Sequence, residues 1–396
     1  MRSELEVSLY DQVIGHLISL EGGRNLFQFT REFLAQTNPP VLSQSFLDQQ
    51  GKLIASIKPR QVKLPPFFSN LLPEGPMRRY LAGLANINPD HEFELLRVLG
   101  SDLPGAVIVS AKAQHNKFEI DANTAQEEEE ALHFSLAGVQ LKFSALMKNK
   151  KVTIPAKGIG GHWILKLPSQ NFPFLPENEF AMMQLARLIG ISVPDIQLVD
   201  ISKIAGLPEL GLMVGDKALM VKRFDRDGDK RIHMEDFAQV FNVFPHDKYQ
   251  KVSYTNMASM VFTLMGHDGL VEFIRRLVFS IVIGNGDMHL KNWSLLYPDH
   301  YQAVLSPAYD LVSTIPYLPN DDLALSLVGK KKMLDIELQD FTRLSEKAAL
   351  PKKVVLETVE QTVSNVREQW QLNQKSFALP ADILKRISLH IDSVRF

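Results

Sequence analysis

The residues with the clearest chemical potential lie in a short polar segment after a long apolar run, Leu277 to Ile283. The breaker Gly284-Asn285-Gly286 ends that run, and Asp287 and Asn292 follow with four residues between them. This spacing is typical of a kinase catalytic loop, in which the carboxylate takes the proton of the attacking hydroxyl and the asparagine holds a magnesium ion. A polar turn after a buried helix would use the same residue types. The rest of the chain must distinguish the two interpretations.

Three further residues supply the remaining parts of a phosphoryl-transfer site, which needs a cation on the nucleotide phosphates and oxygen ligands for magnesium. Lys166 is the lone cation of an apolar strand-like stretch, and Glu179 in the following helix could pair with it, as a strand lysine and a helix glutamate do in kinases. Asp310 follows the loop as a second acid. Singly, each has a structural explanation: a snorkelling lysine, a helix-dipole glutamate and a capping aspartate. Together and in order, they favour an ATP-dependent phosphotransferase.

Composition restricts the class of protein. The chain has 396 residues, a formal net charge of −2, 45% apolar and 22% charged residues, and no cysteine. The lack of cysteine excludes disulfides, thiolate catalysis and cysteine-ligated zinc, and the near-neutral charge does not favour a protein that coats nucleic acid. The eleven histidines show no H-E-x-x-H spacing, and no G-x-S-x-G motif occurs. Because no leader-like or bilayer-length apolar segment is present, we expect a cytoplasmic protein without membrane contact.

Residues 1–112 are predicted to form a small α+β module. From 5 to 34 the chain alternates between apolar and polar residues, as the strands of a half-buried antiparallel sheet do. The positions expected to face its core are Val7, Leu9, Val13, Phe27 and Phe29. The polar stretch 113–131, which contains the acidic run 127–130, is typical of a solvated linker and marks the expected boundary.

The remaining residues are predicted to form two lobes. Residues 132–224 are expected to make a β-rich lobe with one prominent helix that begins after Pro176. Residues 225–396 carry long segments with helical apolar periodicity, the first of which begins at Met234. A β-rich lobe ahead of a helical lobe is the order of a protein kinase, although architecture alone does not fix function.

These motifs together resemble the HipA family, the serine/threonine-kinase toxins of bacterial type II toxin–antitoxin pairs. The matching segments, in family order, are S-x-A-G-x-Q-x-K at 135–142, I-x-K-L-P at 164–168, N-E at 178–179, R-F-D-R at 223–226, D-x-H-x-K-N at 287–292 and Y-D at 309–310. The N-terminal module resembles that of the family through GGRNLFQF and NLLPEGP. The resemblance spans about residues 1 to 320.

The resemblance implies an α+β, two-lobed protein-kinase-like fold that binds ATP and Mg²⁺. The β-rich N-terminal lobe would carry the extra small module, and the C-terminal lobe would be mainly helical. Asp287 would be the general base, and Asn292 and Asp310 would hold the magnesium ion. Glu179 would support Lys166 through an ion pair. The residues implied to contact ATP are Ala137, Gly138, Val139, Gln140, Leu141, Lys142, Lys166, the backbone of Lys222, Arg223 and Phe224, and His289, Leu290, Lys291, Asn292, Tyr309 and Asp310.

The resemblance also implies a mode of regulation, a substrate and a partner. Ser135 matches the serine that the family autophosphorylates, and a phosphate there would add about −1.5 to −2 charge beside a loop that holds anionic phosphates. That charge is expected to push the loop out of the site and switch the kinase off. Family members phosphorylate aminoacyl-tRNA synthetases, which stalls translation and leaves a dormant, persistent cell. A HipB-like helix-turn-helix antitoxin is the expected partner, and DNA is expected to be contacted only through that complex.

Two other classes of function are compatible with parts of the pattern. The chain could be a catalytically quiet module that binds the antitoxin as a co-repressor and keeps a vestigial ATP site, but the intact set Lys166, Asp287, Asn292 and Asp310 argues against decay. Direct chemistry on DNA or direct DNA binding is disfavoured by the near-neutral charge.

Overall fold

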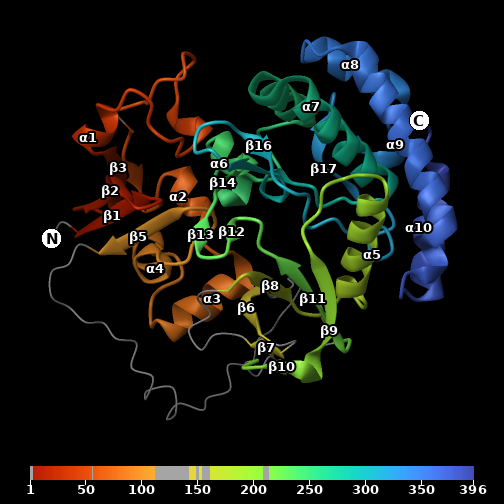
Figure 1. Ribbon diagram of the computed structural model, residues 1–396, viewed down its shortest axis with the longest axis horizontal. Helices are drawn as coiled ribbons and strands as arrows, with labels where there is room; N and C mark the ends of the chain where they lie inside the picture. The colour runs from red at the N-terminus through yellow and green to blue at the C-terminus, as the bar shows by residue number, and fades with distance from the viewer. Residues whose placement is uncertain (1–2, 56, 112–141, 149–150, 154–160, 208–213) are drawn as a thin grey trace.

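The computed structural model describes residues 3–55, 57–111, 142–148, 151–153, 161–207 and 214–396. Figure 1 shows three parts: an N-terminal module in red and orange, a small sheet in yellow and green, and a helical part that ends in the blue C-terminal helices. The cavity described below lies where these parts meet. The predicted linker 113–131 lies outside the described residues.

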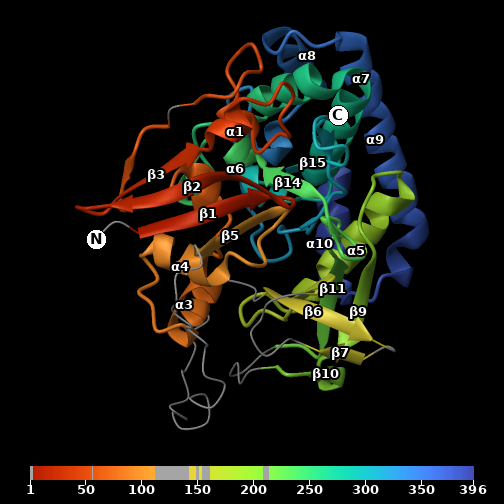
Figure 2. The same cartoon turned by 60° about the vertical axis from the view of Figure 1, so that its left-hand side comes forward.

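The N-terminal module is a five-stranded antiparallel sheet in the order β4-β3-β2-β1-β5, with helices packed beside it. Its strands are β1 Ser3–Leu9, β2 Gln12–Leu20, β3 Arg24–Phe29, β4 Arg60–Gln61 and β5 Val107–Ala111. Its helices are α1 Arg31–Leu34, α2 Pro66–Asn70, α3 Gly75–Leu84 and α4 Glu92–Leu99. Figure 2 shows α3 and α4 on one side of this sheet, with α3 directed toward the small sheet.

One predicted core position of this module is wrong. Val7, Leu9, Phe27 and Phe29 are buried as expected, whereas Val13 is 36% exposed. The reason is a β-bulge between β1 and β2, where the pairing changes from Val7–Gly15 to Ser8–Val13. A bulge adds one residue to a strand and shifts its alternation. Ile14 therefore takes the buried position that a regular strand would give to its neighbour.

The second sheet has six strands in the order β10-β7-β6-β8-β11-β9, all antiparallel pairs except β10 with β7. The strands are β6 Lys142–Lys148, β7 Lys151–Thr153, β8 Trp163–Lys166, β9 Ile196–Asp200, β10 Ile204–Ala205 and β11 Lys217–Lys222. The predicted helix is α5, Leu175–Leu188, and it packs against β11 and β9. Met77 and Tyr80 of α3 pack against the core of this sheet, so the N-terminal module and the sheet are in direct contact.

The C-terminal part is mainly helical. Its helices are α6 Phe237–Val240, α7 Tyr254–Val282, α8 Leu338–Lys347, α9 Lys352–Asn373 and α10 Ala381–Ser393. Its short strands are β12 Arg226–Asp227, β13 Lys230–Arg231, β14 His233–Asp236, β15 Ser294–Tyr297, β16 Val304–Leu305, β17 Asp322–Leu327 and β18 Lys330–Lys332. Helix α7 packs against α9 and bends at Gly266, whose φ of 62° lies outside the helical region.

The helix predicted to begin at Met234 starts later. Residues His233–Asp236 form strand β14, which pairs with β15, and only Phe237–Val240 are helical. Asp236 caps this short helix through a capping box with Gln239. The apolar spacing of the segment fits both structures, and pairing with β15 selects the strand.

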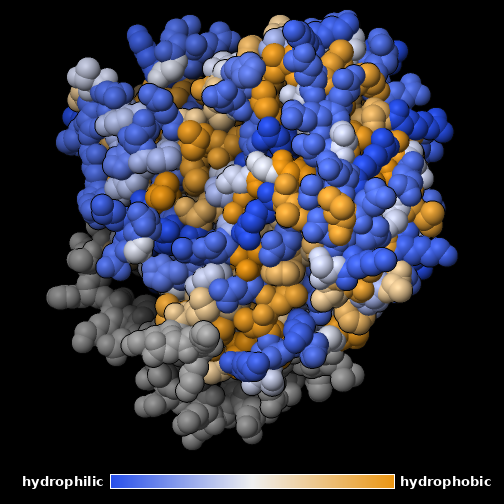
Figure 3. Space-filling view, turned by 45° about the vertical axis from the view of Figure 1, so that its right-hand side comes forward, coloured by the Kyte–Doolittle hydropathy of each residue, from blue (hydrophilic) through white to orange (hydrophobic). Residues whose placement is uncertain are grey.

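The chain thus has an α+β fold of two lobes with an added N-terminal module. No helix in the described part of the chain is long and apolar enough to cross a membrane. The surface in Figure 3 is mostly hydrophilic, with apolar residues in several separate patches rather than one continuous area.

Candidate active site

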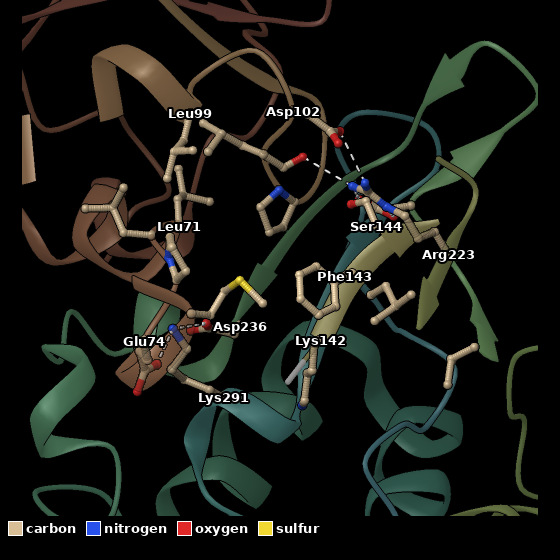
Figure 4. A pocket seen from close by; sticks show the side chains of 18 of the residues that line it. Leu71, Glu74, Leu99, Asp102, Lys142, Phe143, Ser144, Arg223, Asp236 and Lys291 are labelled. Carbon is tan, nitrogen blue, oxygen red and sulfur yellow. Dashed lines mark hydrogen bonds and ion pairs between the residues drawn. The ribbon is translucent and has the colours of Figure 1, made fainter. Parts of the chain in front are cut away.

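A cavity of about 540 Å³ opens where the module, the six-stranded sheet and the helical lobe meet. The sheet contributes Lys142, Phe143, Ile164 and Lys166, and the helical lobe contributes Lys291, Tyr309 and Asp310. Helix α3 and the residues before it form the third wall, where the Tyr80 ring contacts the Phe143 ring edge-on at 6.2 Å between centroids. Figure 4 shows Lys142 and Phe143 opposite Glu74 and Lys291 across this space. A cavity with an apolar wall and charged groups at one end suits a ligand with a ring and an anionic tail.

The charged centre of the cavity is built on Lys166. Its ammonium contacts the carboxylates of Glu179 on α5 and Asp310, and all three groups are largely buried. Burial alone would lower the pKa of Lys166, but the two carboxylates outweigh it and raise the pKa to about 12. The lysine is therefore a fixed positive charge at neutral pH.

Asp310 is shared by two lysines from neighbouring strands. Its Oδ2 accepts a hydrogen bond of 2.8 Å from Lys142 Nζ, while Oδ1 contacts Lys166. Burial would raise the pKa of Asp310, but the two ammonium groups hold it well below its usual range. Its backbone is left-handed, with φ 54°, a conformation that Asp adopts more readily than most residues. The carboxylate is thus ionised and already holds cationic groups.

Asp287 lies in the loop that follows α7. Its Oδ1 accepts a 2.6 Å hydrogen bond from the hydroxyl of Tyr249, and its carbonyl accepts a 2.7 Å hydrogen bond from Asn292 Nδ2. Burial raises the pKa of Asp287, and the bond from Tyr249 opposes this rise. Asn292 therefore shapes the loop around Asp287, and its amide oxygen belongs to the ligand type that Mg²⁺ prefers.

His289 and Lys291, also in this loop, have different environments. Burial lowers the pKa of His289 to about 3, so the ring is neutral, and it meets the Tyr249 ring edge-on at 4.9 Å. Lys291 Nζ lies 2.8 Å from Glu74 Oε1 and donates to the carbonyl of Asn70 at 2.9 Å. In this structure Lys291 lines the cavity and contacts the N-terminal module, and its expected contact with nucleotide phosphates stays a prediction.

The segment expected to meet adenine lines the cavity wall next to the module. The amides of Lys222 and Arg223 already donate to the carbonyls of Asp195 and His162, each at 2.8 Å, so backbone contact with a base would use other atoms. The Arg223 guanidinium turns away from the cavity centre toward Asp102, as Figure 4 shows. The Phe224 ring lies 5.5 Å from the Tyr309 ring between centroids.

The remaining predicted residues have these positions. Leu290 is buried and its amide donates to the carbonyl of Lys248 at 3.3 Å. The Tyr309 hydroxyl bonds to Ser294 Oγ at 2.5 Å and donates to the carbonyl of Lys291 at 2.9 Å. Ser135 and the loop of Ala137, Gly138, Val139, Gln140 and Leu141 lie outside the described residues. Among residues that are described, no group of three or more histidine, aspartate or glutamate side chains could hold a metal ion.

Sequence reasoning did not single out three residues that surround the Asp287 loop: Glu74, Lys248 and Tyr249. Glu74 belongs to the NLLPEGP segment, which was matched only as part of the module, and no motif contains the other two. Their place in the site comes from tertiary contacts between segments far apart in the chain. An exposed tyrosine beside a lysine carries no signal of this kind in sequence.

Comparison with known proteins identifies the family of this chain. Residues 5–110 match the HipA N-terminal domain, and residues 134–370 match the HipA-like C-terminal domain. The chain belongs to the HipA family. The protein named "Putative kinase Y4dM" of Sinorhizobium fredii is 47% identical to it, over 98% of this chain and 97% of that protein. The serine/threonine-protein kinase toxin HipA of Shewanella oneidensis is 25% identical, over 79% of this chain and 76% of that protein.

A solved structure gives the same architecture. HipA of Shewanella oneidensis MR-1, in its complex with HipB and operator DNA, superimposes with a TM-score of 0.73. The alignment covers 98% of this chain and 95% of that one at 20% identity, so it establishes the fold. The α+β, two-lobed kinase-like fold expected from the sequence is confirmed, and the HipA-family kinases named above support kinase activity for this chain.

Proposed function

We propose that this HipA-family chain is an ATP- and Mg²⁺-dependent serine/threonine protein kinase and the toxin of a toxin–antitoxin pair. The observation that carries the proposal is the buried cluster in which Asp310 joins Lys142 and Lys166, with Asp287 nearby as the base. In such a cluster the carboxylate can bind a metal ion, and the two lysines can contact the anionic phosphates.

The donor set fits a magnesium ion. Mg²⁺ takes oxygen ligands and keeps several waters, so one or two protein groups are sufficient. Asp310 offers an ionised carboxylate and Asn292 an amide oxygen, and these residues would hold the ion. When bound, Mg²⁺ would neutralise the negative charge that develops on the phosphates during transfer.

The other residues would perform separate tasks. Lys166 and Lys142 would neutralise the phosphates, and Glu179 would fix the direction of Lys166. Asp287 would accept the proton of the attacking serine or threonine hydroxyl. That hydroxyl oxygen forms the new bond to phosphorus while the bond to the leaving diphosphate oxygen breaks. Because burial raises the pKa of Asp287, its carboxylate is a better proton acceptor than an exposed one.

Family membership supports a proposal for the regulation, the substrate and the partner. We propose that Ser135 is autophosphorylated, that the protein substrate is an aminoacyl-tRNA synthetase, and that a HipB-like antitoxin is the partner through which DNA is contacted. Cytoplasmic action would follow from such a substrate. The Shewanella oneidensis HipA structure, with HipB and operator DNA, supports the choice of partner.

Incubation of the purified chain with γ-labelled ATP and Mg²⁺ tests the activity. Label should appear on Ser135, located by peptide mapping, and Asp287→Asn should remove it. Asp268→Asn, at a fully exposed position on α7, is the matched control and should keep the label. Equal labelling by the Asp287 variant would refute the assigned base. If Mg²⁺-ATP neither labels nor thermally stabilises the wild-type chain, the chain is instead a quiet antitoxin-binding module.

A further inference from the structure

We propose that Glu74 of the N-terminal module is a positioning residue of the phosphoryl-transfer site, where it holds both Lys291 of the Asp287 loop and Lys248, whose carbonyl bonds to that loop. The inference rests on the proposed kinase function and concerns how that site is assembled. It gives the N-terminal module a direct part in catalysis.

Glu74 joins two ammonium groups with one carboxylate. Its Oε1 lies 2.8 Å from Lys291 Nζ, and its Oε2 lies 2.9 Å from Lys248 Nζ. Burial would raise the pKa of Glu74, but the two lysines outweigh it and lower the pKa to about 2. The carboxylate is therefore ionised at any pH at which the protein functions. Both lysine side chains are well covered, at 15% and 20% exposure, so solvent screens these pairs less than ordinary surface pairs.

Lys291 is part of the catalytic loop, and Lys248 is connected to it by a hydrogen bond. Lys291 is the residue before Asn292, whose side chain holds the carbonyl of Asp287. Lys248 accepts a 3.3 Å hydrogen bond from the amide of Leu290, and the adjacent Tyr249 donates to Asp287 at 2.6 Å. A single carboxylate from the module thus contacts one residue of the loop that carries the proposed base, Lys291, and one residue that bonds to this loop, Lys248.

The backbone around Glu74 is suited to a fixed contact. Glu74 follows Pro73 and precedes Gly75 and Pro76, and it is the residue at the N-terminus of α3. Gly75 has a φ of 55°, which favours glycine, and proline restricts φ to a narrow range. Asn70, one helix earlier, supplies a carbonyl to Lys291 at 2.9 Å. The module therefore holds two acceptors for the Lys291 ammonium, the Glu74 carboxylate and the Asn70 carbonyl, in fixed positions.

Loss of the negative charge of Glu74 should disturb the geometry of the Asp287 loop more than it weakens nucleotide binding. In Glu74→Gln, two ammonium groups lose their shared carboxylate, and Lys291 is free to shift with its loop. Displacement of a catalytic loop by about 1 Å costs on the order of 10²-fold in rate. We expect kcat, here the single-turnover rate constant of autophosphorylation at saturating ATP, to fall between about tenfold and 100-fold, with KM for ATP nearly unchanged because Lys166 and Lys142 remain in place.

The experiment uses the full chain and measures kcat and KM for ATP in four proteins: wild type, Glu74→Gln, Glu74→Asp and Glu94→Gln. Glu94 lies on α4 of the same module, where it forms an ion pair of 2.7 Å with Arg97 of its own helix, so this control should behave as the wild type. Glu74→Asp keeps the charge and should recover part of the lost kcat. Lys248→Met, alone and combined with Glu74→Gln, should give losses that are not additive, because both changes break one bridge.

The outcomes separate this inference from the proposed function. If the wild type acquires no ATP-dependent label, the proposed kinase function is refuted. An active wild type with an equally active Glu74→Gln, or additive losses in the double variant, would overturn the role of Glu74 alone. An equal loss of kcat in Glu74→Asp would also overturn the charge-based role. If Glu74→Gln does not fold, Lys248→Met must show the same fall in kcat at constant KM, and normal kcat there would refute the inference.

Discussion

Replacing Glu235 with glutamine should change how the stability of the protein depends on pH. Glu235 lies on β14, where its carboxylate accepts hydrogen bonds from the Ser43 hydroxyl at 2.5 Å, the Gln44 amide at 3.0 Å and the Tyr297 hydroxyl at 2.5 Å. The site joins the N-terminal module to the helical lobe. Glutamine has nearly the same shape, and its amide combines one acceptor oxygen with an NH₂ donor, so the variant resembles a glutamate that keeps its proton.

The size of the effect follows from the pKa. Burial outweighs the three hydrogen bonds and raises the pKa of Glu235 from 4.5 to about 7. Between these values the folded protein holds a proton that the unfolded chain has lost, so the wild type loses stability as pH rises through the window. A difference of about 2.5 pH units, at about 1.36 kcal/mol per unit, corresponds to about 3 kcal/mol. Glutamine does not titrate and suffers no such loss.

Urea unfolding of both proteins from pH 4.5 to pH 8 measures the difference. The free energy of unfolding of Glu235→Gln should rise relative to wild type by about 3 kcal/mol across this range. Other titrating groups, including Asp236, are present in both proteins and cancel to first order. Glu94→Gln, on the surface of α4, should show a constant difference from wild type. A constant difference for Glu235→Gln as well would mean that Glu235 titrates normally in the folded state, and the reasoning would fail.

Two further changes test the charged centre and the proposed base. Lys166→Met leaves the buried carboxylate of Glu179 without its cation, so the free energy of unfolding at pH 7 should fall by about 3–5 kcal/mol in urea titrations; wild-type stability would contradict the buried pair. Tyr249→Phe removes the hydrogen bond that lowers the pKa of Asp287. A bond worth about 1 kcal/mol corresponds to about 0.7 pH unit. The acid limb of the pH–rate profile should move up by about that amount, and an unmoved limb would exclude Asp287 as the titrating base.

The sequence predicted the fold where periodicity and chain order carry the information. The β-rich lobe, helix α5 and the long C-terminal helices were predicted from apolar spacing, and each is present. The exceptions are local. Val13 is exposed because a bulge is set by pairing with another strand, and Met234 lies in a strand because β15 pairs with it. Neither partner can be read from the segment itself.

The residues of the candidate site also fall into those that the sequence could identify and those that it could not. Residue types that are unusual in their context, such as Lys166 in an apolar strand and Asp310 after the second lobe begins, could be selected from sequence alone. The side-chain direction of Lys291 could not, because Glu74 and the carbonyl of Asn70 determine it. Glu74 was matched only as part of the NLLPEGP segment of the module, and no motif contained Tyr249. The contacts of these residues join segments that are distant in the chain, from 38 residues for Tyr249 and Asp287 to 221 for Asn70 and Lys291, and local sequence patterns do not contain such contacts.

The Arg223 and Arg226 contacts make the kinase lobes dependent on the module for charge balance. The two guanidinium groups share Asp225 within their own segment and Asp102 in the module, which gives two positive and two negative charges in a buried site. Without residues 1–111, the two guanidinium groups would lose Asp102 and the Leu103 carbonyl and would become exposed to water. We therefore expect the lobes without the module to be less stable than the whole chain.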